Sequence, residues 1–225
     1  PSIRFKEHDL VMDEEIAIID AKTRNEKIKN FFVENKRLIF SISLFLISIL
    51  FIFYSYQIYK DNHRKWLANK YNSATIEFEK GDKSKIISSM KELIEDKDST
   101  YSPLGLYFLI DNNLIENKDE INNLFDVLIN KTKLEKEIQN LVIYKKALYN
   151  FDTVSENDLL KMLNPVINSE STWKSHSLYL MAEYFYLNNE KEKAKEFFNQ
   201  ILILNNANVD IKLESQKRLN KDLSE

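Results

Sequence analysis

The chain has 225 residues, a net charge of −3, no cysteine and only two glycines. The small net charge gives no electrostatic field that would favour nucleic acid, and the absence of cysteine excludes disulfides, thiol chemistry and cysteine-based zinc sites. Two glycines cannot build a glycine-rich phosphate loop.

The first predicted element is an uncharged run between Arg37 and Lys60. Its twenty-two residues, 38–59, are dominated by Leu, Ile and Phe, and a helix of this length crosses a hydrocarbon core of about 30 Å. A cleaved signal peptide is disfavoured because the run is too long and no small-x-small cleavage site follows it. A buried core helix is the other alternative, but such helices rarely stay uncharged on every face. The run therefore predicts one uncleaved membrane anchor.

The flanks of this run predict its orientation. Tyr54, Tyr56 and Tyr59 lie near its C-terminal end, where aromatic rings favour lipid headgroups. Six basic residues precede the run and four follow it: Lys22, Arg24, Lys27, Lys29, Lys36 and Arg37 against Lys60, Arg64, Lys65 and Lys70. Because basic residues favour the cytoplasmic side, we expect residues 1–37 in the cytoplasm, 38–59 in the membrane and 60–225 on its outer side. The lack of cysteine suits either side of a bacterial inner membrane, and for such a membrane we expect residues 60–225 in the periplasm.

Three serines recur every seven residues inside the predicted anchor, namely Ser41, Ser48 and Ser55. Small hydroxyl residues on one stripe allow a second transmembrane helix to approach closely. The alternative is that each serine bonds only a carbonyl of its own helix. The stripe is therefore a candidate contact with a partner helix.

From residue 60 onward the spacing of apolar residues by three and four predicts helices joined by short turns. The predicted turns lie at residues 81–82, 96–99 and 188–189. Ser155 and Asp158 form a predicted capping box at a helix start, and Pro165 lies near the end of that helix. The last stretch, 210–223, carries only a thin apolar stripe of Ile211, Leu213 and Leu219. It is typical of a helix that caps a stack.

An internal repeat gives the strongest indication of the fold. Four sets of residues share steps of 12, 4 and 3: Ala74, Ile86, Met90 and Leu93; Leu109, Ile121, Phe125 and Leu128; Ala147, Leu159, Leu163 and Val166; Ala182, Ala194, Phe198 and Ile201. Successive sets begin 35, 38 and 35 residues apart, close to the tetratricopeptide period of about 34. The sequence predicts an all-α protein with one transmembrane helix and a tetratricopeptide-like solenoid of about four helix pairs. A non-repetitive helical bundle is the alternative.

A second pattern predicts a protein-binding groove. Aromatic residues seven apart share a helix face in three of the repeats: Tyr71 and Phe78, Tyr144 and Phe151, Tyr179 and Tyr186. His176 and Glu183 fall on the same face of the last repeat. Such rings either line a groove for peptide segments or fill the seams between repeats as core, and the sequence leaves both interpretations open.

No pattern of catalytic or metal-binding residues is evident. The histidines, His8, His63 and His176, are far apart, and none has metal-ligand spacing to another. Acidic pairs such as Asp119 and Glu120 are typical of solvated helix faces, and no serine lies in a nucleophile turn. We therefore expect no catalytic, cofactor or metal site and no small-molecule substrate, which disfavours a membrane-bound hydrolase.

This layout resembles the bacterial inner-membrane YfgM family, the ancillary subunit of the Sec translocon. The likeness covers residues 14–220. It rests on FFVENKRL at 31–38, the aromatic and basic residues at 59–66, Ser99-Thr100-Tyr101 and Trp173. The chain departs from the family in lacking a glycine after Asn35 and most of the alanines.

The resemblance implies a role that composition does not show. It implies an adaptor beside the Sec translocon that works with a membrane-anchored periplasmic chaperone of the prolyl-isomerase type and with secreted chains. No catalytic residues come with the family. The alternative is a repeat scaffold that organises cell-envelope or division machinery without any link to the translocon.

Overall fold

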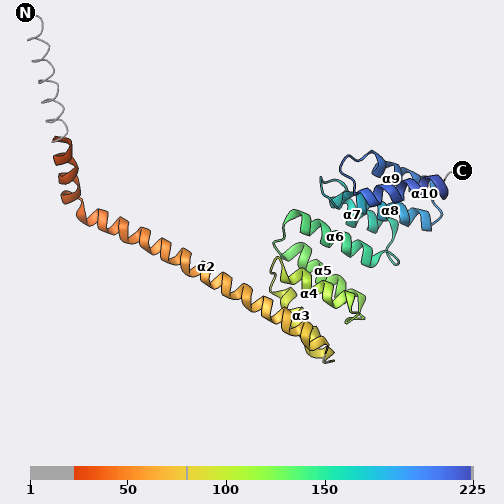
Figure 1. Ribbon diagram of the computed structural model, residues 1–225, viewed down its shortest axis with the longest axis horizontal. Helices are drawn as coiled ribbons and strands as arrows, with labels where there is room; N and C mark the ends of the chain where they lie inside the picture. Colours follow the sequence, from red (N-terminus) through yellow and green to blue (C-terminus); the bar gives the residue numbers. More distant parts are fainter. Residues whose placement is uncertain (1–22, 80, 224–225) are drawn as a thin grey trace, which may run out of the picture. The chain divides into compact units, whose positions relative to one another are not determined.

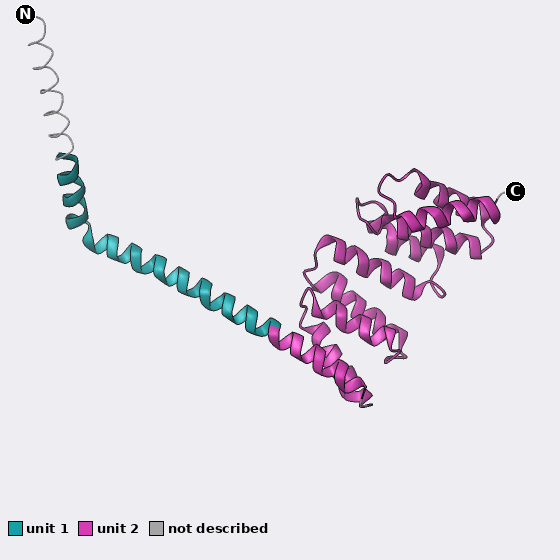
Figure 2. Ribbon diagram, in the orientation of Figure 1, with its two compact units in different colours: residues 1–64 teal, residues 65–225 magenta. Residues whose placement is uncertain are grey.

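The computed structural model describes residues 23–79 and 81–223. It divides the chain into two units, residues 1–64 and 65–225 (Figure 2). Every regular element within the described ranges is an α-helix (Figure 1), which confirms the all-α prediction. The boundary between the units lies close to the predicted start of the outer domain at residue 60.

The first unit contains the predicted membrane anchor. Residues 23–34 are helical, and the helix is interrupted at Asn35, whose side-chain amide donates to the Phe31 carbonyl at 2.9 Å. Helix α2 (Lys36–Phe78) begins directly afterwards and includes the whole apolar run. This helix is long and apolar enough to span a membrane, and none of its most apolar window is buried.

The second unit contains the C-terminal part of α2 and eight further described helices. These are α3 (Lys83–Glu95), α4 (Tyr101–Asp111), α5 (Lys118–Lys131), α6 (Lys136–Asn150), α7 (Glu156–Ile167), α8 (Lys174–Leu187), α9 (Lys191–Ile203) and α10 (Val209–Lys221). From α3 to α10 each helix packs against the next, and α3–α5, α6–α8 and α8–α10 contacts join alternate helices.

The predicted turns and cap are confirmed. Gly81, Lys97 and Asn189 have left-handed φ angles of 97°, 61° and 62°, and each lies between two helices. At the start of α7 the Asp158 N–H donates to the Ser155 hydroxyl at 3.2 Å, while that hydroxyl donates to the Asp158 carboxylate at 2.6 Å. The helix ends at Ile167, two residues after Pro165.

The core positions follow the spacing seen in the sequence. All sixteen residues of the four sets are buried, and each set draws one residue from an even-numbered helix and three from the helix after it. The apolar core forms two clusters, which meet on α6 between Val142 and Ala147. The predicted stripe on α10 is wrong at Leu213, which is 62% exposed, whereas Ile211 and Leu219 pack against the second cluster.

Candidate functional site

The first predicted aromatic pair lies in the seam between α2 and α4. The Tyr71 ring lies 6.3 Å from the rings of both Tyr101 and Phe108, and the Phe78 ring lies 5.3 Å from that of Phe108, edge to face. Both predicted residues are half-buried against the first core cluster. Burial raises the pKa of Tyr71, with the Asp111 carboxylate as a second cause.

The second pair lies in the seam between α6 and α8. Tyr144 stacks on Trp173 with ring centroids 5.8 Å apart, and the His176 ring lies 5.8 Å from Tyr144 and 5.0 Å from Trp173. Phe151 meets Tyr184 edge to face at 5.8 Å. The structure therefore brings His176 together with Tyr144 from the preceding helix pair.

The residues of the last pair face α9 and α10. Tyr179 lies 5.6 Å from the ring of Phe198, and the Arg218 guanidinium lies 4.9 Å from the ring centroid of Tyr186. Arg218 also donates to the Glu183 carboxylate at 2.9 Å. This part of the predicted groove is in contact with the C-terminal helix of the chain itself.

The aromatic residues are thus distributed over three separate seams: between α2 and α4, between α6 and α8, and between α8 and the pair α9–α10. Each seam is filled by contacts between rings or between a ring and a cation, and all the predicted groove residues keep some exposed surface. They do not converge on one cavity. Their contacts fit the interpretation as packing between repeats, and only their outer edges face solvent.

The serine stripe lies on the exposed surface of α2. Ser41, Ser48 and Ser55 are all exposed, and the Ser48 hydroxyl donates to the Leu44 carbonyl at 2.9 Å. For Ser48 the structure therefore contains the bond within its own helix that serines in helices commonly make. A contact with a partner helix stays a prediction.

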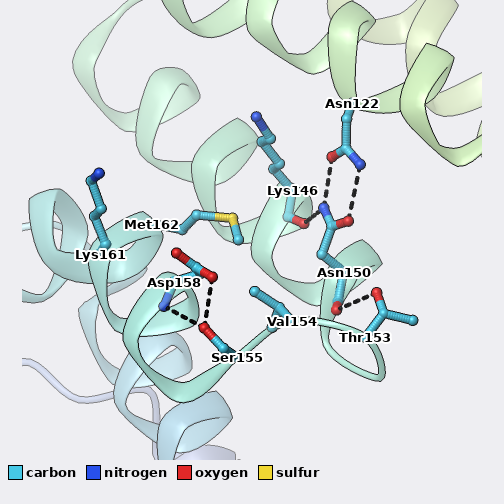
Figure 3. A pocket seen from close by; sticks show the side chains of 9 residues that line it. All are labelled: Asn122, Lys146, Asn150, Thr153, Val154, Ser155, Asp158, Lys161 and Met162. Carbon is cyan, nitrogen blue, oxygen red and sulfur yellow. Dashed lines mark hydrogen bonds between the residues drawn. The ribbon is translucent and has the colours of Figure 1, made fainter.

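A cavity of about 450 Å³ lies among α5, α6 and α7 (Figure 3). One side of its lining is a reciprocal amide pair: Asn150 donates to Asn122 at 2.7 Å, and Asn122 donates back at 3.0 Å. Lys146 lines the same cavity and pairs with Asp126 at 2.7 Å. The lining is polar and open, and its amides and the Lys146 ammonium already have partners.

Sequence reasoning missed this amide pair. One signal was available, because Asn150 continues the buried stripe of Ile143 and Ala147 on α6, and an amide in an apolar stripe requires a partner. The partner itself lies 28 residues away, outside the range of any helical periodicity.

The described residues offer no arrangement of groups for metal chemistry. No cluster of three or more His, Asp or Glu side chains in residues 23–79 and 81–223 is placed to hold a metal ion. His63 stacks on Tyr59 at 6.1 Å, and His8 lies outside the described residues. Burial lowers the pKa of His176, an effect that the Thr172 backbone partly offsets.

Comparison with known proteins identifies no relative of this chain. No family model, curated protein or solved structure matches the chain.

Proposed function

We propose that the chain is a single-pass inner-membrane adaptor whose outer part, residues 60–225, is a tetratricopeptide-like solenoid that binds proteins. One observation supports this most directly. Helix α2 carries an unburied apolar span, and its C-terminal part contributes Leu67 and Ala74 to the core of a stack of helices. The buried sets with their common spacing support the tetratricopeptide-like assignment, since in such arrays each helix pair buries its apolar face against its neighbours.

The proposal places the solenoid in the periplasm, following the excess of basic residues before the anchor. Protease added to spheroplasts would then digest the C-terminal part while the inner membrane is intact. Digestion only after rupture of that membrane would reverse the orientation. A known cytoplasmic protein, probed in the same samples, controls for leakage.

The proposed partners are subunits of the Sec translocon, a membrane-anchored periplasmic chaperone of the prolyl-isomerase type, and secreted chains. This part of the proposal rests on the resemblance to the YfgM family. A photo-crosslinking amino acid of leucine size, with a diazirine in its side chain so that it does not fill neighbouring space, placed at Leu148, which is 48% exposed on α6, should capture translocon or chaperone subunits in cells. The same group at Leu213, 62% exposed on α10, is the matched control for non-specific capture.

The outcomes of this experiment separate the two functions considered. Capture of translocon or chaperone subunits from Leu148 supports the translocon adaptor. Capture of division or envelope-assembly proteins alone would favour the scaffold, and capture of none of these proteins would reject the adaptor.

The proposed role is binding without catalysis. Purified full-length protein should not turn over generic ester or peptide substrates. Turnover that survives repeated purification, and that is lost when the chain is removed with an antibody, would contradict this part of the proposal.

A further inference from the structure

The seam between α4 and α6 lacks the two aromatic residues that stand at fixed positions in the other seams. In α2, α6 and α8 an aromatic residue stands three positions before and four positions after the small residue of the repeat: Ala74, Ala147 and Ala182. Three positions before Leu109 in α4 stands Leu106, which is fully buried. Four positions after Leu109, just beyond the end of α4, stands Asn113, which is exposed and has a left-handed φ of 49°. No ring from these positions packs onto α6.

A cavity of about 210 Å³ lies at this seam, and we call it the α4–α6 slot. Its apolar walls come from three helices: Tyr107 and Ile110 on α4, Phe125 on α5, and Leu148 and Tyr149 on α6. Phe125 is fully buried, and its ring lies 6.0 Å from that of Tyr149. The slot therefore has a packed aromatic wall and, at the half-exposed Leu148, an opening to solvent.

Two opposite charges line the same slot. The Lys145 ammonium lies 4.5 Å from the ring centroid of Tyr107, and Asp111 is exposed. No ion pair among the described residues includes Lys145 or Asp111. The Tyr107 hydroxyl is buried without a hydrogen-bond partner in the described ranges, and burial raises its pKa, so it remains a donor. The slot thus offers one charged donor, Lys145, and one charged acceptor, Asp111, beside an apolar hollow, while the Tyr107 hydroxyl, which solvent does not reach, lies within its wall.

We propose that the α4–α6 slot takes a large apolar side chain from a segment of a partner protein, whose backbone then lies beside Lys145 and Asp111. A peptide backbone supplies both a carbonyl acceptor for the ammonium and an N–H donor for the carboxylate. This inference rests on the proposed protein-binding function and assigns it a specific site.

Other occupants match these features less well. The volume is below the roughly 300–1,000 Å³ that is usual for small-molecule sites, so it suits one side chain better than a whole ligand. A lipid acyl chain or an apolar metabolite has no dipoles, so it would gain no polar contact with Lys145 or Asp111. A simple anion would satisfy Lys145 but would be repelled by Asp111.

The test uses the full chain in lipid nanodiscs and a fluorescent Gly-Ser peptide, blocked at both ends, with one central Phe. A peptide with Ala at the centre is the comparison, and empty nanodiscs give the background. Fluorescence anisotropy should show the Phe peptide binding at least about tenfold more tightly than the Ala peptide. Equal binding of the two peptides, or no binding of either, would overturn the inference.

Two matched substitutions then locate the site on α6. Leu148→Trp fills the slot from an exposed position, so it should reduce the preference for the Phe peptide to less than about twofold. Ile138→Trp, at a 37% exposed position outside the slot, is the control and should leave this preference unchanged. Lys145→Met keeps the length of the side chain and should weaken binding of the Phe peptide severalfold. Retention of the full preference in Leu148→Trp would place binding elsewhere and overturn the inference.

These results are separable from those for the proposed function. If translocon or chaperone subunits are captured in cells while the peptides do not distinguish Leu148→Trp from the unmodified chain, the adaptor function stands and the slot is wrong. If the slot selects Phe but no such subunit is captured, the slot stands and the translocon adaptor is rejected.

Discussion

Asn122 and Asn150 form a reciprocal polar contact between α5 and α6. Each amide donates to the other, and the Asn150 amide also donates to the Lys146 carbonyl at 2.8 Å. Asn150 is only 8% exposed, so water replaces a lost partner poorly. The pair therefore fixes the position of α5 relative to α6 through a contact that few other residue types can make.

Removing one amide should lower the free energy of unfolding by more than the contribution of its own hydrogen bonds. We expect Asn122→Ala and Asn150→Ala each to lower the free energy of unfolding by about 1–3 kcal/mol, because the remaining amide is left without its partner. The double variant should cost less than the sum of the two. Urea unfolding of the full chain in micelles, followed by circular dichroism, measures all three, and strictly additive costs would contradict the coupling.

His176 should make stability depend on pH. Burial is the main cause that lowers its pKa, so the unfolded chain binds this proton more readily than the folded chain. The contribution to stability is complete above the unfolded pKa of about 6.5 and is lost as the pH falls toward the folded pKa. The free energy of unfolding should decline between about pH 7 and 5.

The His176→Asn variant isolates this contribution, and it should show a smaller decline over the same pH range. The Glu137 carboxylate, which accepts hydrogen bonds from Thr172 and Ser171, has a lowered pKa and acts in the same direction. Its contribution is lost only as the pH falls below the ordinary value of about 4.3, so measurements above about pH 5 separate the two. An unchanged decline in His176→Asn would rule out His176 as its source.

At the scale of elements, Gly105 allows α4 to approach α3 closely. A Cβ atom at this position would lie 3.1 Å from the Met90 carbonyl oxygen and 3.4 Å from the Ile94 Cγ1 atom. Ser102, three residues earlier in α4, is fully buried and donates to the Leu93 carbonyl at 2.7 Å. The two helices are therefore held at a separation that leaves little room for a methyl group.

Gly105→Ala should be destabilising although alanine favours helix. The gain in helix propensity is about 0.8–1 kcal/mol, whereas overpacking typically costs about 1–3 kcal/mol, so we expect a net loss of up to about 2 kcal/mol. Ser88→Ala, at an exposed position of α3, is the matched control and should stay within about 0.5 kcal/mol. Denaturant midpoints measure both, and a stabilised Gly105→Ala variant would show that the helices can separate at little cost.

Features that depend on residues close together in the sequence could be predicted from it. The Ser155 cap, the turns at Gly81 and Asn189, and the buried sets all depend on residues within about two helices of one another. The Asn122–Asn150 pair, the α4–α6 slot and the exposure of Leu213 depend on which helices become neighbours. Periodicity identifies a buried face but not the side chain opposite it, so these features required coordinates.

At the scale of the whole molecule, the second unit has two cores that share α6. The first cluster extends from α2 to Val142 and the second from Ala147 to Leu223. In a stack where each helix pair contacts only its neighbours, stability is approximately a sum of local terms. A destabilising substitution in one core should therefore lower the local stability mainly of the helices around that core.

Two buried phenylalanines test this expectation. Phe125→Ala in the first core and Phe198→Ala in the second should each cost about 3–5 kcal/mol, since both side chains are fully buried. Hydrogen exchange should accelerate mainly in α3–α5 for the first variant and in α8–α10 for the second. Equal acceleration in both regions would show that the unit unfolds as a single cooperative block.

Helix α10 has a consequence for assembly. Its inner face meets α8 through the Arg218 contacts with Glu183 and Tyr186, whereas Gln216, Lys217 and Asn220 are exposed. A stack of similar pairs that ended on an apolar face would accept a second copy end to end, and repetition of that contact would give an open filament. Burying the face of α10 that carries Gln216, Lys217 and Asn220 against a second copy would desolvate these polar groups, which disfavours end-to-end growth into fibres.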